Sequence, residues 1–344
     1  MLSPVSVRRY WPLLLASCLL LLAVLVLLAL AIGAVPIAPY KLLLWLQGEA
    51  DLQTKLIVES LRLPRALLAI CLGALLAVCG AAAQGLFRNP LADPSLIGVS
   101  GGASAGASIV IVLLNFSQWG WLGLSLVSLG AFTGAVLVVL CVYRLATNAM
   151  GTSVATMLLA GVAFSYLAGG LANGLEFVAD NHKLRQISLW QMGGLESADA
   201  IQVVLAFSVF CVVFYILYRL RSALNALLLG ESEARHLGVD VARVKRRVIV
   251  CIAAGVGVSV ALAGVISFIG LIVPHIVRMV LGPNHRYLLP VSACVGAMLL
   301  VVADLCARTF IAPTELPIGL LTTALGAPVF IMLLRSRFRY GEAV

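Results

Sequence analysis

The chain contains few charged residues. Only 11% of its 344 residues are Asp, Glu, Lys or Arg, whereas 62% are hydrophobic. Soluble domains carry about 25% charged residues, so lipid is the expected solvent for much of this chain. The net charge of +9 does not indicate a nucleic-acid surface, because the basic residues are scattered between apolar runs instead of gathered on one face.

The sequence also lacks the motifs of an ATPase or a metal-binding domain. It has no G-x-x-x-x-G-K-[ST] phosphate-binding loop, so any ATP hydrolysis must be carried out by another subunit. Its eight cysteines all lie in apolar runs without a C-x-x-C pair, which favours packing roles over metal or disulfide roles. We expect this chain to bind no metal and no cofactor, and to contain no second soluble domain.

Long apolar segments dominate the sequence. At roughly 20 residues per crossing, the length allows about ten membrane-spanning helices. The first run, Leu13 to Val35, has 23 uncharged residues; a signal-peptide core has about 7–15, so we expect an uncleaved helix. The predicted segments are 12–35, 63–86, 92–114, 121–143, 152–178, 200–218, 248–265, 267–281, 287–307 and 316–334.

Charge distribution indicates how the chain passes through the uncharged stretch 248–277, where Gly264, Gly270 and Pro274 offer break points. If the chain turns back there, 16 of the 23 Lys and Arg residues share the side of the N-terminus; if it crosses once, the split is 12 against 11. The positive-inside rule favours the first arrangement. We therefore predict an all-α polytopic membrane protein, one transmembrane domain over 1–344 with both termini cytoplasmic, whose eighth segment does not cross at full depth.

Two polar segments interrupt the apolar pattern on the predicted inner side. In the turn 87–95, two prolines and Asn89 stop one helix, and Asp93 or Ser95 can cap the next. The turn is either an ordinary hairpin or a rigid plug at the inner mouth of a pathway. The basic loop 219–247 has the pattern of two short amphipathic helices. It is equally well explained as an interfacial helix or as a docking site for a cytoplasmic partner.

Arginines also occur on the predicted outer side, where the positive-inside rule disfavours them. Arg62, Arg65 and Arg308 lie at helix ends there. They either anchor lipid headgroups or form a landing surface for an acidic partner. Asp304 and Glu176 lie near outer helix ends as well, and we expect them to be paired structurally.

Small residues recur at helical spacing in two predicted segments. Such spacing lets helix backbones approach closely in lipid. We expect packing within one subunit, with a pathway-lining or dimer role as the alternative. The residues are Gly98, Gly101, Gly102 and Gly106 in the third segment, and Gly170 and Gly174 in the fifth.

Six stretches match a known family in chain order, between about 60 and 334. Together they resemble the FecCD-type permeases, the membrane subunits of binding-protein-dependent ABC importers for vitamin B12 and for iron chelates such as siderophores and haem. The stretches are Leu61–Arg65 (LRLPR), Arg88–Pro94 (RNPLADP) leading to Gly98, Leu229–Glu231 (LGE) with Ala234–Val239 (ARHLGV), Gly264–His275 (GVISFIGLIVPH), Ala303-Asp304 with Ala307-Arg308, and Glu315–Gly319 (ELPIG).

The resemblance implies a type II ABC importer permease fold in the bacterial inner membrane. It implies a homodimer of the permease, two cytoplasmic subunits that bind ATP and Mg, and a periplasmic binding protein that delivers the ligand. It assigns no catalysis to this chain. By likeness, Arg62, Arg65 and Arg308 contact the binding protein, Asn89, Leu91, Thr152 and Ser153 form inner constrictions, and Leu229, Gly230, Glu231, Ala234, Arg235, His236, Leu237 and Gly238 couple to the ATPase.

Two other classes compete with an importer. A secondary transporter needs ionisable residues at mid-membrane, whereas here the charges lie at helix ends; a channel needs neither outer arginines nor an inner docking loop. Among cargoes, iron complexes are placed first and cobalamin second, because Lys183 and Arg185 in an outer loop suit an anionic cargo. His182 and His275 have no partner at ligand spacing, so axial ligation of haem iron is not expected.

Overall fold

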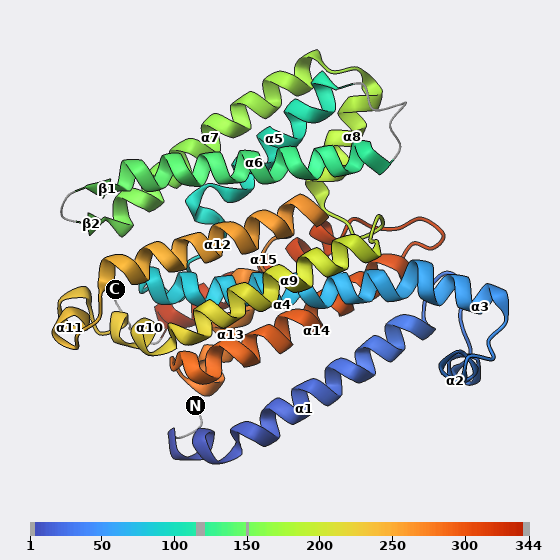
Figure 1. The fold of residues 1–344 in the computed structure, drawn as a ribbon, viewed down its shortest axis with the longest axis horizontal. Helices are drawn as coiled ribbons and strands as arrows, with labels where there is room; N and C mark the ends of the chain where they lie inside the picture. Colours follow the sequence, from blue (N-terminus) through green and yellow to red (C-terminus); the bar gives the residue numbers. More distant parts are fainter. Residues whose placement is uncertain (1–3, 115–120, 149–150, 340–344) are drawn as a thin grey trace.

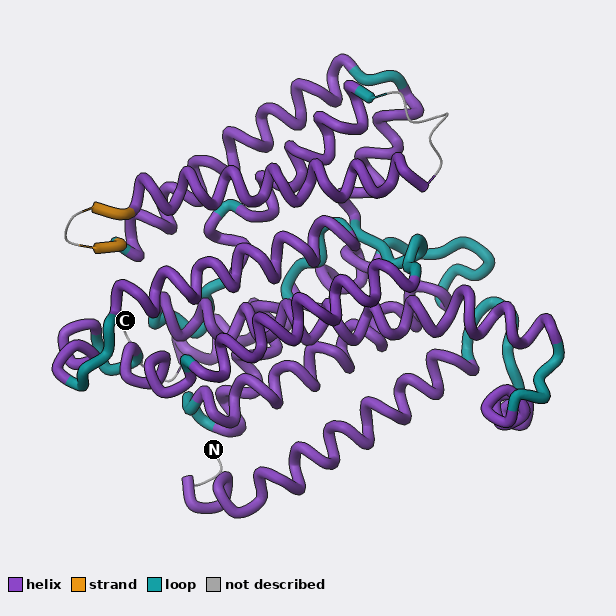
Figure 2. The backbone as a smooth tube through the Cα atoms, viewed as in Figure 1, coloured by secondary structure: helices purple, strands orange, loops and turns teal. Residues whose placement is uncertain are grey.

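The computed structural model describes residues 4–114, 121–148 and 151–339. These residues fold almost entirely as helix, with one short antiparallel hairpin (Figure 2). In chain order the elements are α1 (Pro4–Ala31), α2 (Pro39–Gln47), α3 (Leu52–Leu56), the π-helix η1 (Ile57–Arg62), α4 (Leu63–Phe87), the 3-10 helix η2 (Pro94–Ile97), α5 (Val99–Leu113), α6 (Trp121–Ala146), β1 (Thr147–Asn148), β2 (Gly151–Thr152), α7 (Val154–Val178), α8 (Asn181–Met192), α9 (Ala200–Arg219), α10 (Arg221–Leu227), α11 (Glu231–His236), α12 (Val241–Ala263), α13 (Ile269–Leu281), α14 (His285–Thr309) and α15 (Ile318–Arg339).

Helix α4 forms the centre of the molecule (Figure 1). It packs against α9, α12, α13 and α14, and its Leu68, Leu72 and Leu75 are fully buried. Helix α1 lies along the outside of α14, while α5, α6 and α7 form a second layer that contacts the rest through α12. The short helices α10 and α11 lie at one end of the bundle, the α11 end, and α8 lies at the opposite, α8 end.

Glycines permit the closest helix contacts. A Cβ atom on Gly73 would lie 2.3 Å from the carbonyl oxygen of Gly296, so a side chain there would force α4 and α14 apart. Gly106 of α5 likewise faces the Gly130 backbone of α6, which confirms packing within one subunit for the third predicted segment. Gly170 and Gly174 of α7, in contrast, both face open space, so the expectation of packing within one subunit is wrong for these two residues of the fifth predicted segment.

The ten predicted apolar segments each coincide with a helix. In the described part of the chain, seven helices are long and apolar enough to cross a membrane, and three shorter apolar helices accompany them: Val99–Leu113, Ile269–Leu281 and Ile318–Met332. Helix α13 has 13 residues, which corresponds to about 20 Å of helix against a hydrocarbon thickness of about 30 Å. It therefore does not cross at full depth.

The chain turns back between α12 and α13, as the charge distribution predicted. Helix α12 ends at the α8 end, where Gly264 packs against the Gly193 backbone. Helix α13 then begins near the middle of α4, where Gly270 contacts Gly80, and runs towards the α11 end, where the His275 Nδ1 lies 3.1 Å from the Pro90 carbonyl oxygen. The start of α1 and the end of α15 also lie at the α11 end (Figure 1).

Candidate functional site

The turn between α4 and η2 is a rigid element at the α11 end. The Asn89 side-chain oxygen accepts a hydrogen bond from the Leu91 backbone N–H at 2.9 Å, and Asp93 caps η2 by accepting from the Ser95 N–H at 2.7 Å. Donation from the buried His275 ring to the Pro90 carbonyl fixes the turn to α13. Asn89 and Leu91 therefore lie in a hydrogen-bonded turn at the α11 end, and their gating role stays a prediction.

Helices α10 and α11 form a hairpin that projects beyond the bundle (Figure 1). Leu224 and Leu227 of α10 are buried, and Asn225 bonds to both Asn284 and the His285 N–H at the start of α14. The base of the hairpin is thus fixed to the membrane domain. Its outer surface is open, with Leu229 and Leu237 about two-thirds exposed, alongside Arg235, His236 and Gly238.

Gly230 and Ala234 determine the shape of this hairpin. Gly230 has a φ of 127° and Gly238 a φ of 81°, a backbone region that favours glycine, and each bounds α11. Ala234, in the middle of α11, is fully buried. These residues shape the projection, whereas the leucines and charged residues form its accessible surface.

A buried lysine connects the hairpin to the strands before α7. The Lys245 Nζ lies 2.6 Å from the Glu231 Oε1 and donates to the Thr152 carbonyl oxygen at 2.7 Å. The Lys245 side chain is 5% exposed and that of Glu231 28%, so the ammonium is buried whereas the carboxylate is partly open to water. Thr152 itself is buried, and Ser153 next to it caps α7 through the Thr156 N–H. The predicted coupling residue Glu231 and the predicted constriction at Thr152 are therefore joined by one side chain.

Two of the outer arginines, Arg65 and Arg308, belong to a buried ionic cluster at the α8 end. The Arg65 Nε lies 2.5 Å from the Asp304 Oδ1, and its Nη1 lies 2.6 Å from the Glu315 Oε2. The Arg308 Nε lies 3.0 Å from the other Asp304 oxygen. The expected structural pairing of Asp304 is thus confirmed. Glu176, also expected to be paired, accepts a hydrogen bond from Gln191 at 2.8 Å.

Arg62 holds the end of α1. Its guanidinium donates to the carbonyl oxygens of Leu30, Ala31 and Val35, and the Arg308 guanidinium donates to that of Ala29. Contact with a binding protein stays a prediction for these arginines. Because they are 6–7% exposed and carry these contacts, reversing the charge of Arg62 and Arg308 would also loosen α1 and so would not test docking alone.

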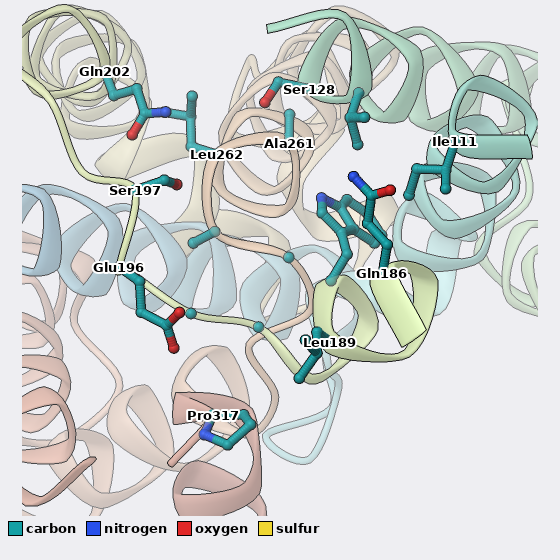
Figure 3. A pocket seen from close by; sticks show the side chains of 16 residues that line it. Ile111, Ser128, Gln186, Leu189, Glu196, Ser197, Gln202, Ala261, Leu262 and Pro317 are labelled. Atoms are coloured by element: carbon teal, nitrogen blue, oxygen red, sulfur yellow. The ribbon is translucent and has the colours of Figure 1, made fainter. Parts of the chain in front are cut away.

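Two neighbouring hollows open at the α8 end. One, of about 530 Å³, has Arg62, Arg65 and Arg308 in its lining. The other, of about 260 Å³, lies between α8, α6 and the end of α12, and its apolar walls carry polar groups such as Gln186, Gln202 and the carboxylate of Glu196 (Figure 3). Both offer space for a ligand or a partner's side chain.

No metal-binding arrangement is found in the described ranges: they contain no cluster of three or more His, Cys, Asp or Glu side chains. His275 lies buried against Pro90, while His182 lies exposed at the start of α8, at the opposite end. The structure does not bring the two histidines together. Of the two α8 cations expected to face an anionic cargo, the Lys183 ammonium donates to the Val112 carbonyl, whereas Arg185 stays exposed.

Sequence reasoning missed Lys245 and Glu315 as members of these two clusters. Lys245 appeared as one of several basic residues in a loop, and Glu315 as part of a family motif. One signal could have singled out Lys245. At helical spacing it lies on the apolar face of α12, whereas Arg246 and Arg247 lie on the exposed face.

Comparison with known proteins agrees with this architecture. The FecCD transport family profile matches residues 21–336. The chain is 44% identical to the hemin transport system permease protein HmuU of Yersinia pestis, over 81% of this chain and 83% of that protein. It is 40% identical to the vitamin B12 import system permease protein BtuC of Vibrio vulnificus, over 93% and 94% of the two chains.

Among solved structures, the chain is similar to one described as an inward-facing metal-chelate type ABC transporter. The TM-score is 0.84 and the identity 31%, over 94% of this chain and 99% of the other. The fold is therefore that of type II importer permeases, and the chain is a multi-pass inner-membrane permease of ABC importers. Sequence, fold and relatives all lead to one assignment: this chain belongs to the FecCD transport family.

Proposed function

We propose that this permease moves an iron complex, haem or a ferric siderophore, across the bacterial inner membrane. Two copies pair around a central pathway, a periplasmic binding protein delivers the complex at the α8 end, and two ATP-binding subunits seat on the α10–α11 hairpins. ATP and Mg reside on those subunits. Both termini of the permease are cytoplasmic.

The link from Glu231 through Lys245 to Thr152 carries the coupling part of this proposal. A partner that displaces α11 pulls on the ion pair between Glu231 and the buried Lys245, and the same ammonium holds the backbone just before α7. Because packed helices switch between discrete arrangements instead of deforming continuously, such a pull favours a shift of α7. The open space at Gly170 and Gly174 on α7 supports its contact with the second copy.

The choice of cargo rests on one relative and on the charge at the α8 end. A hemin permease is among the relatives, and the exposed Arg185 on α8 suits the carboxylates of an anionic complex. Cobalamin is the second candidate, because permeases for vitamin B12 are 40–43% identical to the chain.

Uptake into proteoliposomes tests the proposal. With its ATPase and binding protein, the permease is expected to accumulate radiolabelled haem or ferric siderophore only when ATP and Mg are enclosed with the ATPase. Cobalamin assayed in parallel decides between the two cargoes. Vesicles that contain the permease without ATPase serve as the control. Accumulation in that control, driven by a proton or sodium gradient, would contradict the ABC mechanism and favour a secondary transporter.

A further inference from the structure

A hollow of about 420 Å³ lies between α9 and α12 at the α11 end. Its walls come from the last turns of α9 and from the second and third turns of α12. The exposed surface of α11 does not contribute to it. The proposed coupling site does not use this hollow. Its lining residues are Tyr215, Ile216, Arg219, Leu220, Arg246, Arg247, Val250 and Cys251.

Three arginines converge on this hollow from two helices. Arg219 comes from the last turn of α9, and Arg246 and Arg247 from α12, and all three are exposed. Within the described ranges, none of the three forms an ion pair with a carboxylate, whereas Arg243 and Lys245 of the same helix are both paired. The hollow thus concentrates positive charge that the chain leaves uncompensated.

The walls next to these guanidinium groups are apolar. Ile216 and Cys251 line the interior, and Val250 and Tyr215 are each about 60% exposed at its rim. Along α9 the exposed surface continues with Val212, and most of this helix is not covered by the rest of the chain. A cationic group of side chains therefore adjoins an uncovered apolar helix flank, with an aromatic ring at the boundary, as expected at a membrane interface.

We propose that this hollow binds the phosphate headgroup of an anionic phospholipid. Guanidinium groups hold phosphate through paired hydrogen bonds, and basic pockets between membrane helices on the cytoplasmic side accept anionic headgroups. The acyl chains would lie along the exposed flank of α9. An acidic patch on a cytoplasmic protein fits less well, because such a partner would have to reach between two membrane helices onto Val250 and Cys251.

The site lies next to Lys245, the residue that links α11 to the backbone before α7. Arg246 follows Lys245, which holds Glu231 and the Thr152 carbonyl. A bound headgroup therefore lies beside the start of α12, on the opposite side of the helix from the buried Lys245 side chain. The proposal concerns binding and holds for any cargo of the permease.

Native mass spectrometry of the full chain tests this site. After release from nanodiscs of equal phosphatidylglycerol and phosphatidylcholine content, the wild type is expected to retain phosphatidylglycerol with roughly tenfold preference. Removing the three charges together, as Arg219→Gln, Arg246→Gln and Arg247→Gln, should reduce this preference to about twofold or less. The matched control removes three exposed arginines at the same end, as Arg144→Gln, Arg243→Gln and Arg286→Gln, and should keep the preference.

Equal loss of preference in both triple variants would overturn the proposal, because general surface charge would then explain retention. Inorganic phosphate that binds the wild type as tightly as the lipid and displaces it would indicate a small-anion site and also overturn it. If the first triple variant fails to fold, Arg246→Lys with Arg247→Lys keeps the charge but removes paired hydrogen bonding. This variant should lose part of the preference, and an unchanged preference would contradict a phosphate-shaped site.

Discussion

Replacing Lys245 with methionine is expected to reduce the cargo moved per ATP hydrolysed by about tenfold, within the range typical of coupling between two sites. Methionine keeps an apolar stem of similar length but cannot hold the Glu231 carboxylate or the Thr152 carbonyl, which the ammonium contacts at 2.6 Å and 2.7 Å. ATP hydrolysis should continue, because the exposed surface of α11 is unchanged. The ratio of uptake to hydrolysis in proteoliposomes measures the effect.

The charge-reversing change Glu231→Arg should act in the same direction and more strongly, because it places a second cation against Lys245. Arg243→Met is the matched control: Arg243 lies on the same helix, is exposed, and pairs only with Asp240 of its own first turn. Combining Glu231→Gln with Lys245→Met should lower the ratio of uptake to hydrolysis little further than Lys245→Met alone. Both changes remove the same ion pair, so their effects should not add. A normal ratio in the Lys245→Met permease would remove this link from the mechanism.

Replacing Asp304 with alanine is expected to destabilise the permease by about 3–5 kcal/mol, the cost of breaking a buried ion pair by removing one partner. The carboxylate lies between Arg65 at 2.5 Å and Arg308 at 3.0 Å, and all three side chains are less than 10% exposed. Its loss leaves two guanidinium groups close together with one exposed carboxylate, Glu315, in reach of Arg65. Thermal unfolding in detergent measures the change.

Glu315→Gln is the comparison for this variant. Its side chain is 35% exposed, so water screens the contact and the change should cost about 1 kcal/mol or less. The two variants therefore separate a buried anchor from a peripheral contact within one cluster. Equal melting temperatures for Asp304→Ala and the wild type would show that the cluster does not hold α4 and α14 together.

The helices of this fold could be predicted because a helix that lies in lipid needs a long, nearly uncharged apolar run, which is visible in the sequence. Each apolar run long enough to enter the membrane became a helix, and the distribution of arginines indicated the turn at Gly264. The inner turn around Asn89 was also recognisable, because prolines and capping residues act locally.

Contacts between distant residues could not be predicted in this way. Arg65 meets Asp304 across 239 positions, and Lys245 meets Thr152 across 93. Hydropathy places such residues at a helix end but does not determine which helix end lies beside them. The outer arginines therefore looked like free cations, whereas the fold buries them against carboxylates and backbone carbonyls.

Accessibility of α11 from the two faces of the membrane tests the central claim most directly. In a background with the eight native cysteines replaced by alanine, a membrane-impermeant maleimide is applied to intact cells and to inside-out vesicles carrying His236→Cys. The control is His182→Cys on α8, which is exposed like His236 but lies at the opposite end of the molecule. His236→Cys should react only in inside-out vesicles and His182→Cys only in intact cells; reaction of His236→Cys in intact cells would contradict a cytoplasmic α11.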